Sequence, residues 1–158
     1  MPVIAALLLA SPIAAQGLEP QLATLSTATR INGAPIADPL FVRAVYAANG
    51  GKLLWTDPAR FASLQKAIAD SVNDGLTPAD YHAAALANFK GSVGERDLLA
   101  TDALVLLADH LRHGKVHPQS FDSEWNFGQN GHKPGTPPTQ PEIDRAMVII
   151  NAPDVAAA

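Results

Sequence analysis

Three histidines lie close together in the sequence, and their spacing is the first feature that could support chemistry. His110 and His113 are three positions apart, so on a helix their side chains would share a face and could chelate a metal ion. His117 lies beyond Gly114, where a helix would end, and no HExxH motif or nearby set of carboxylates completes a site. Histidine is also favoured at a helix C-terminus by the helix dipole. We therefore predict no metal site and place these histidines at the solvated end of a helix.

A pair of acids near a tryptophan is the second candidate. Asp122 and Glu124 precede Trp125, and two carboxylates at a fixed separation could hydrolyse a glycosidic bond while the indole stacks on the sugar. Such acids are common on soluble surfaces, so we favour surface residues and keep a small peptidoglycan hydrolase as a minor alternative. Trp55 and Trp125 are both expected to anchor the core, because a buried indole covers a large apolar area.

Other catalytic motifs are absent from the sequence. The chain has no cysteine, which excludes a thiol nucleophile, disulfides and cysteine-ligated metal centres. No serine occupies a G-x-S-x-G motif, and Gly50-Gly51 and Gly91 lack the spacing of a phosphate-binding or dinucleotide-binding loop. We therefore assign no catalytic residue, no cofactor-binding residue and no cofactor. The remaining carboxylates are expected to serve as helix caps and surface charges.

Length and charge narrow the class of protein further. The chain has 158 residues, about one domain, of which 47% are hydrophobic and 16% are charged. Its net charge is −4, and its 11 lysines and arginines are scattered singly. Nucleic-acid-binding proteins usually carry a basic patch, and membrane-surface proteins a basic run. We therefore expect neither nucleic acid nor a membrane surface as a partner.

The N-terminus has the pattern of an export signal. Residues 3–10 are almost wholly apolar, too short to span a bilayer, and small residues follow them up to Ala15. We predict a signal peptide over residues 1–15, cleaved before Gln16, although no basic residue precedes the apolar run. The mature protein would then be periplasmic, with no stable membrane span. Residues 16–38 are polar and weakly periodic, which predicts a flexible lead-in.

Apolar periodicity predicts helices in the rest of the chain. The expected helices cover residues 39–48, 58–73, 78–88, 95–113 and, as a short final one, 142–150. Asp38 is the expected N-cap of the first, and Thr77 of the third, where Asp80 would complete an approximate capping box. The sequence thus predicts an all-α fold over residues 39–158: a small irregular bundle of four to five helices with a Gly/Pro-rich loop near the C-terminus.

The longest predicted helix is expected to lie at the centre of the bundle. It is apolar on nearly every side between residues 98 and 111, which is typical of a helix covered by others. The helix over residues 58–73 carries a single apolar stripe that includes Val72. We therefore expect the central helix to pack against this stripe, with Trp55 closing one end of the core. The residues in this contact would be Leu104, Leu107 and Leu111 on one side, and Phe61, Leu64 and Ile68 on the other.

Several short blocks occur in an order that resembles a known family. Tyr46 precedes L-W-T-D, then D-G-L-T-P-A-D-Y-H, D-L-L-A-T-D-A-L, H-L-R-H-G-K-V-H-P and W-N, at residues 54–57, 74–82, 97–104, 110–118 and 125–126. This order is similar to the N-terminal scaffold domain of the large periplasmic L,D-transpeptidases of Gram-negative bacteria. The combination of D-G-L-x-P-x-D-Y with a downstream G-K-V-x-P is its most specific part.

The resemblance implies a role in peptidoglycan cross-linking without a reaction centre in this chain. Family members carry a cysteine nucleophile in an S-H-G-C-type motif of a separate catalytic domain, and no position here matches it. The implied partners are that catalytic domain and peptidoglycan. The helix start at Pro153-Asp154-Val155, four residues before the end, is interpreted as a sign of truncation. A free-standing envelope binding or interaction module remains the alternative.

Overall fold

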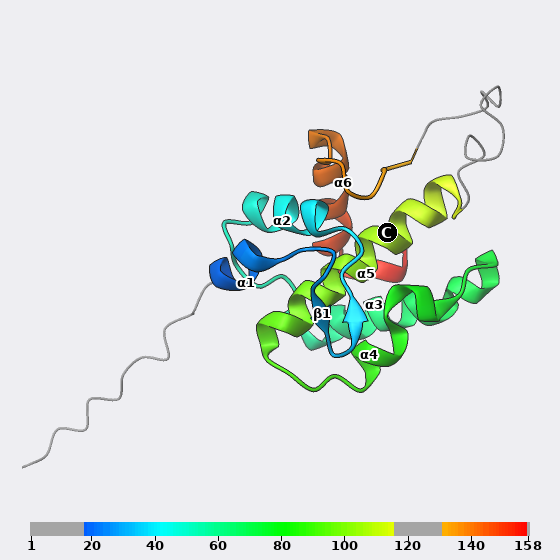
Figure 1. Cartoon of the computed structure of the whole chain (residues 1–158). Helices are drawn as coiled ribbons and strands as arrows, with labels where there is room; N and C mark the ends of the chain where they lie inside the picture. The colour runs from blue at the N-terminus through cyan, green and yellow to red at the C-terminus, as the bar shows by residue number, and fades with distance from the viewer. Residues whose placement is uncertain (1–17, 116–130, 158) are drawn as a thin grey trace, which may run out of the picture.

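The computed structural model describes residues 18–115 and 131–157 (Figure 1). The described part of the chain is predominantly helical, as predicted, with one small two-stranded sheet. Its elements are α1 (Glu19–Thr24), β1 (Arg30–Ile31), β2 (Ala34–Pro35), α2 (Pro39–Ala48), α3 (Pro58–Asp70), η1 (Ser71–Asp74), η2 (Pro78–Tyr81), α4 (Ala83–Ala87), α5 (Val93–His113), α6 (Gln140–Ile150) and η4 (Val155–Ala157).

Helix α5 is the centre of the fold, as its apolar circumference predicts. It contacts α2, α3, α4, α6, η2 and the strand β1, which surround it in Figure 1. The helix begins with a capping box in which the Ser92 side chain accepts from the Glu95 amide and the Glu95 carboxylate accepts from the Ser92 amide. Gly114 ends it with a positive φ of 84°.

Aspartate caps followed by proline set the starts of the two helices beside α5. The Asp38 carboxylate accepts from the Phe41 amide at 3.0 Å, and Asp57 accepts from the Ala59 amide at 2.9 Å. Proline follows each cap, where its missing N–H costs nothing. The predicted cap at Asp38 is therefore confirmed.

The prediction of a flexible lead-in is wrong for residues 18–38. This segment forms α1 and a hairpin, and it buries four apolar side chains in the core: Leu18, Leu25, Ile31 and Ile36. Asn32 and Gly33 make the turn between β1 and β2 with φ values of 49° and 82°, as a tight hairpin requires. The Asn32 side chain also donates to the Ala85 carbonyl at 2.9 Å, which ties the hairpin to α4.

The third predicted helix is interrupted. Residues 78–87 form η2 and α4, separated by His82, which has a φ of 59° in the left-handed region. The Thr77 side chain makes no cap hydrogen bond, so the predicted capping box is wrong. His82 bonds to the carboxylate of Asp102 at 2.7 Å, and this tertiary contact accompanies the backbone turn that breaks the helix.

The predicted core is confirmed at its centre and wrong at its ends. Trp55, Leu64, Ile68, Leu104 and Leu107 are all buried in one cluster, with Phe61 partly buried against it. By contrast, Leu111 is 50% exposed and Val72 is 55% exposed. Leu111 lies in the last turn of α5. Val72 lies in η1, where the tighter 3-10 winding takes it off the stripe that α3 sets up.

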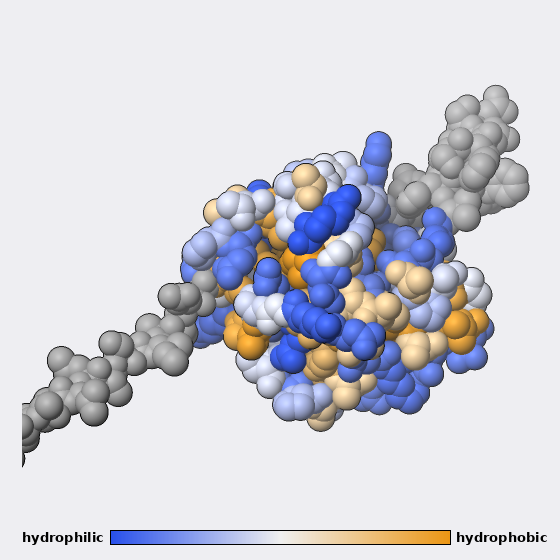
Figure 2. All heavy atoms as spheres, turned by 60° about the horizontal axis from the view of Figure 1, so that its bottom comes forward, coloured by the Kyte–Doolittle hydropathy of each residue, from blue (hydrophilic) through white to orange (hydrophobic). Residues whose placement is uncertain are grey.

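The C-terminal part of the described chain matches its prediction closely. Residues 131–139 contain no helix or strand, which agrees with the predicted loop, and α6 follows at Gln140–Ile150. Figure 2 shows one face of the protein, on which hydrophilic residues cover most of the surface and apolar residues form separate patches. Across residues 18–115 and 131–157, no helix combines the length and apolar character needed to cross a bilayer.

Candidate functional site

The carboxylate of Asp97 organises the junction between α2, α5 and the segment before α3. It is 1% exposed and accepts from the backbone amides of Leu54 at 2.9 Å and Trp55 at 2.8 Å. The Tyr46 hydroxyl donates to it as well. Thr101, one turn further along α5, accepts from the Trp55 indole at 3.0 Å. A buried carboxylate is thus matched to three donors, which is how a charge inside a protein is tolerated.

Asp102 forms a second buried centre on α5. Its two carboxylate oxygens accept from the amides of Ala37 and Asp38, at 3.1 and 3.0 Å, and so hold the chain that leads into α2. Oδ2 also lies 2.7 Å from Nε2 of His82. Both side chains of this pair are buried, at 0% and 7% exposure. Asp102 therefore joins the start of α2 to the η2–α4 junction through α5.

His132 connects the loop before α6 to the rest of the bundle. Its Nε2 lies 2.7 Å from the Asp38 carboxylate, and its Nδ1 lies 3.4 Å from that of Glu142. Its backbone amide donates to Asp109 on α5 at 2.9 Å, and its ring packs edge-on against Phe41. His132 thus joins α2 and α6 through its imidazole and α5 through its backbone amide.

Environment shifts the ionisation of several of these groups. Burial raises the pKa of Asp38, although the Phe41 amide and the nearby His132 act in the opposite direction. Burial and the Asp97 charge hold the pKa of Tyr46 well above its ordinary value. Burial also opposes ionisation of Glu142, but the hydrogen bonds from Thr139 and the charge of His132 outweigh it and lower its pKa.

The histidines singled out from the sequence have other partners. Nδ1 of His110 lies 2.9 Å from the Tyr81 hydroxyl, and Nδ1 of His113 lies 2.9 Å from Asp109 one turn earlier. Within residues 18–115 and 131–157, no group of three or more metal-ligating side chains comes together. Trp55 is confirmed as a core anchor at 1% exposure. His117, Asp122, Glu124 and Trp125 lie outside the described residues, as does the predicted signal peptide.

The carboxylates of Asp38, Asp97 and Asp102 have a structural role that the sequence did not suggest. All three are buried and hold backbone amides, so the expectation of caps and surface charges is wrong for Asp97 and Asp102 and incomplete for Asp38. His82 and His132 were also missed. A charged residue inside an otherwise apolar helix is the signal that could have found Asp97 and Asp102, because such a residue needs a buried partner.

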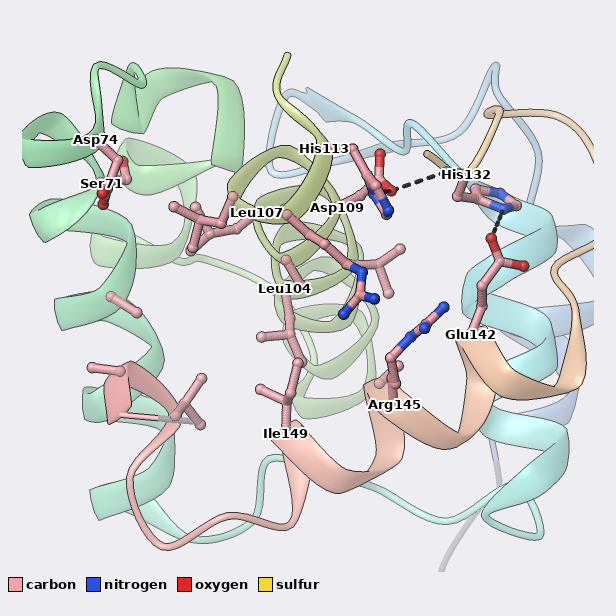
Figure 3. A pocket seen from close by; sticks show the side chains of 18 of the residues that line it. Ser71, Asp74, Leu104, Leu107, Asp109, His113, His132, Glu142, Arg145 and Ile149 are labelled. Atoms are coloured by element: carbon pink, nitrogen blue, oxygen red, sulfur yellow. Dashed lines mark hydrogen bonds and ion pairs between the residues drawn. The ribbon is translucent and has the colours of Figure 1, made fainter. Parts of the chain in front are cut away.

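A cavity of about 420 Å³ opens beside this network, between α3, α5, α6 and η4 (Figure 3). Leu104, Leu107 and Ile149 line its middle. In Figure 3, Ser71 and Asp74 lie on the α3 side, while Arg145 and Glu142 extend from α6 on the other. The cavity is therefore apolar at its centre and charged at its edges.

The described side chains are arranged to hold the fold together. The Ser71 hydroxyl, on the cavity wall, donates to the Ile68 carbonyl at 2.7 Å. Among the described residues no hydroxyl bonds to the imidazole of either buried His–Asp pair, and Nδ1 of His132 faces Glu142 instead. Hydroxyls within hydrogen-bond reach of a base lie elsewhere: Ser63 donates to Asp154 at 2.8 Å, and the Tyr81 hydroxyl lies 2.9 Å from Nδ1 of His110.

The sequence matches one known protein family over most of its length. The family model of the Scaffold domain matches residues 41–157. The chain belongs to the Scaffold domain family. The match begins inside α2 and ends in η4, so it includes every segment of the Asp97 and Asp102 centres except the one up to Leu40. Comparisons with curated proteins and with solved structures find no match.

Proposed function

We propose that this Scaffold domain is a non-catalytic segment of an L,D-transpeptidase that acts in peptidoglycan cross-linking in the cell envelope. The observation that carries the proposal is the family match over residues 41–157, combined with the order of the sequence blocks. Its partner would be the catalytic domain that carries the cysteine nucleophile. The chain itself has no cysteine and supplies no thiolate.

The placement of the sequence blocks supports an architectural role. The block at residues 97–104 contains Asp97 and Asp102, which hold the amides of four residues from two segments of chain. The block at residues 74–82 contains Gly75, with a φ of 75°, and Tyr81, which is fully buried. The residues that carry the resemblance therefore build the helical frame. Such a frame suits a domain that positions another one.

The proposal predicts that the full chain alone does not join stem peptides. Purified protein would be incubated with disaccharide tetrapeptides, and cross-linked dimers and cleaved glycans would be sought by mass spectrometry. A reaction in which a cysteine-type L,D-transpeptidase catalytic domain is added provides the positive control. Dimers formed by the chain alone, abolished by heat and retained after repurification, would contradict the proposal; glycan cleavage would instead support the hydrolase alternative.

Export to the envelope is the second part of the proposal. It rests on the apolar run at residues 3–10 and the small residues up to Ala15. Cell fractionation with mass spectrometry of the N-terminus tests it. A mature chain that starts at Gln16 in the periplasmic fraction supports export, whereas an intact N-terminus in the cytosol contradicts it.

A further inference from the structure

The cavity between α3, α5, α6 and η4 has the size and lining of a small-molecule site. Its volume of about 420 Å³ lies in the range of ligand pockets, roughly 300–1,000 Å³. Apolar side chains from α2, α3, α5, α6 and η4 line it, among them Leu104, Leu107, Ile149 and Val155. Leu111, at its rim, is 50% exposed, so apolar surface is in contact with solvent there. An apolar ligand body would remove that surface from water.

Two arginines at the cavity wall have their charge available for a ligand. Arg112 from the last turn of α5 and Arg145 from α6 both line the cavity, and both side chains are exposed. Neither side chain forms a hydrogen bond or an ion pair with another residue in the described part of the chain. Figure 3 shows Arg145 projecting along the α6 side of the cavity. Guanidinium groups are well suited to bind carboxylates and other planar oxyanions.

Most carboxylates that line the same cavity are already engaged. Asp109 accepts from the His132 amide and pairs with His113. Glu142 accepts from both donors of Thr139, and Asp70 pairs with Lys66. Asp74 lies across the cavity, on the α3 side (Figure 3). Among the described residues on the α5–α6 side, Arg112 and Arg145 are therefore the charged side chains without a hydrogen-bond or ion-pair partner, while Glu142 keeps its negative charge because its Thr139 donors are neutral.

We propose that this cavity binds an amphipathic anion: a compact apolar body carrying one carboxylate or similar oxyanion. The apolar body would lie against Leu104, Leu107 and Ile149, and the anion would lie between Arg112 and Arg145. The two unpartnered guanidinium groups favour this class over neutral or cationic amphiphiles. This binding activity is separate from the proposed role in peptidoglycan cross-linking and does not depend on it.

Three probes that differ only in the head group test the selectivity. The full chain, with its leucine and isoleucine methyl groups labelled for NMR, would be titrated with decanoate, decanol and decyltrimethylammonium below their aggregation concentrations. We expect saturable shifts at the methyl groups of Leu104, Leu107 and Ile149. Decanoate should bind at least about tenfold more tightly than decanol, since one charge-assisted hydrogen bond accounts for that factor. The cationic probe should bind more weakly than decanol.

Charge-matched variants locate the anion. R112Q and R145Q should each weaken decanoate binding by about tenfold and leave decanol binding unchanged. K90Q removes one positive charge from an exposed lysine outside the cavity and should leave decanoate binding unchanged. Equal affinity for all three probes would overturn the proposal. So would shifts confined to other methyl groups, absence of saturable binding, or unchanged decanoate binding in both arginine variants.

Discussion

Replacing Asp97 by asparagine is expected to destabilise the protein strongly while changing its shape very little. The wild-type carboxylate is almost fully buried and accepts from the Leu54 amide, the Trp55 amide and the Tyr46 hydroxyl. An asparagine carbonyl can still accept at one of the two positions. Its NH₂ group must then face the backbone N–H of either Leu54 or Trp55, because one of these amides lies at each oxygen, and a donor cannot satisfy another donor.

The magnitude follows from the hydrogen bonds that change. A hydrogen bond to a charged group contributes about 1.5–3 kcal/mol, and an unsatisfied buried donor costs about 1–3 kcal/mol. D97N loses at least one such bond and leaves at least one donor unpaired. We therefore expect the free energy of unfolding to fall by about 3–5 kcal/mol, a large fraction of the roughly 5–15 kcal/mol typical of a whole domain.

Urea unfolding followed by circular dichroism measures this change, with the slope compared between variants to check that the compactness of both states is unchanged. D70N is the matched control. Asp70 is half-exposed and pairs with Lys66 on the surface, so its loss should cost no more than about 1 kcal/mol. A D97N protein that unfolds within about 0.5 kcal/mol of the wild type would refute the view that this carboxylate holds the junction.

Three further predictions concern the core, the caps and pH. L107A should lose about 2–5 kcal/mol of stability, and L111A, at 50% exposure, less than about 0.5 kcal/mol; equal losses by urea unfolding would contradict the packing. S92A removes the first capping box and should cost about 1 kcal/mol in the same assay, with S26A as an exposed control outside any helix. Hydrogen bonds from Ser92 and Thr139 lower the pKa of Glu95 and Glu142, so the stability that these carboxylates contribute is present above pH 4.5 and lost as pH falls through their lowered pKa values. Unfolding free energies measured across this range should therefore decline more steeply in the wild type than in the E95Q/E142Q double variant, and identical slopes would contradict the shifts.

Local sequence patterns predict the long helices well because their determinants lie within a few residues. The central position of α5 follows from its own composition, and the starts of α2 and α3 follow from an aspartate with a proline directly after it. Two real capping boxes, S-V-G-E and T-Q-P-E, are visible in the sequence and were overlooked. So was the Asn32-Gly33 hairpin turn, a strong local signal between apolar residues.

The interruption at His82 and the buried carboxylate network depend on residues far apart in the chain. His82 pairs with a carboxylate 20 positions away, and His132 with one 94 positions away. No local pattern identifies such a partner, because a buried polar residue shows only that some partner must exist. The cavity likewise depends on how α6 and η4 pack against α3 and α5, which periodicity within each helix leaves undetermined.

Association with a catalytic domain tests the central proposal most directly. The purified full chain would be titrated by calorimetry with the catalytic domain of a cysteine-type L,D-transpeptidase from the same genome. The catalytic domain of an unrelated D,D-transpeptidase serves as the control. Interfaces between domains resemble transient protein interfaces, so we predict saturable one-to-one binding with a Kd on the order of 1–100 μM, and none to the control. No binding, or binding with a Kd weaker than about 100 μM, would contradict a scaffold role in L,D-transpeptidation. Equal binding to both catalytic domains would contradict it as well.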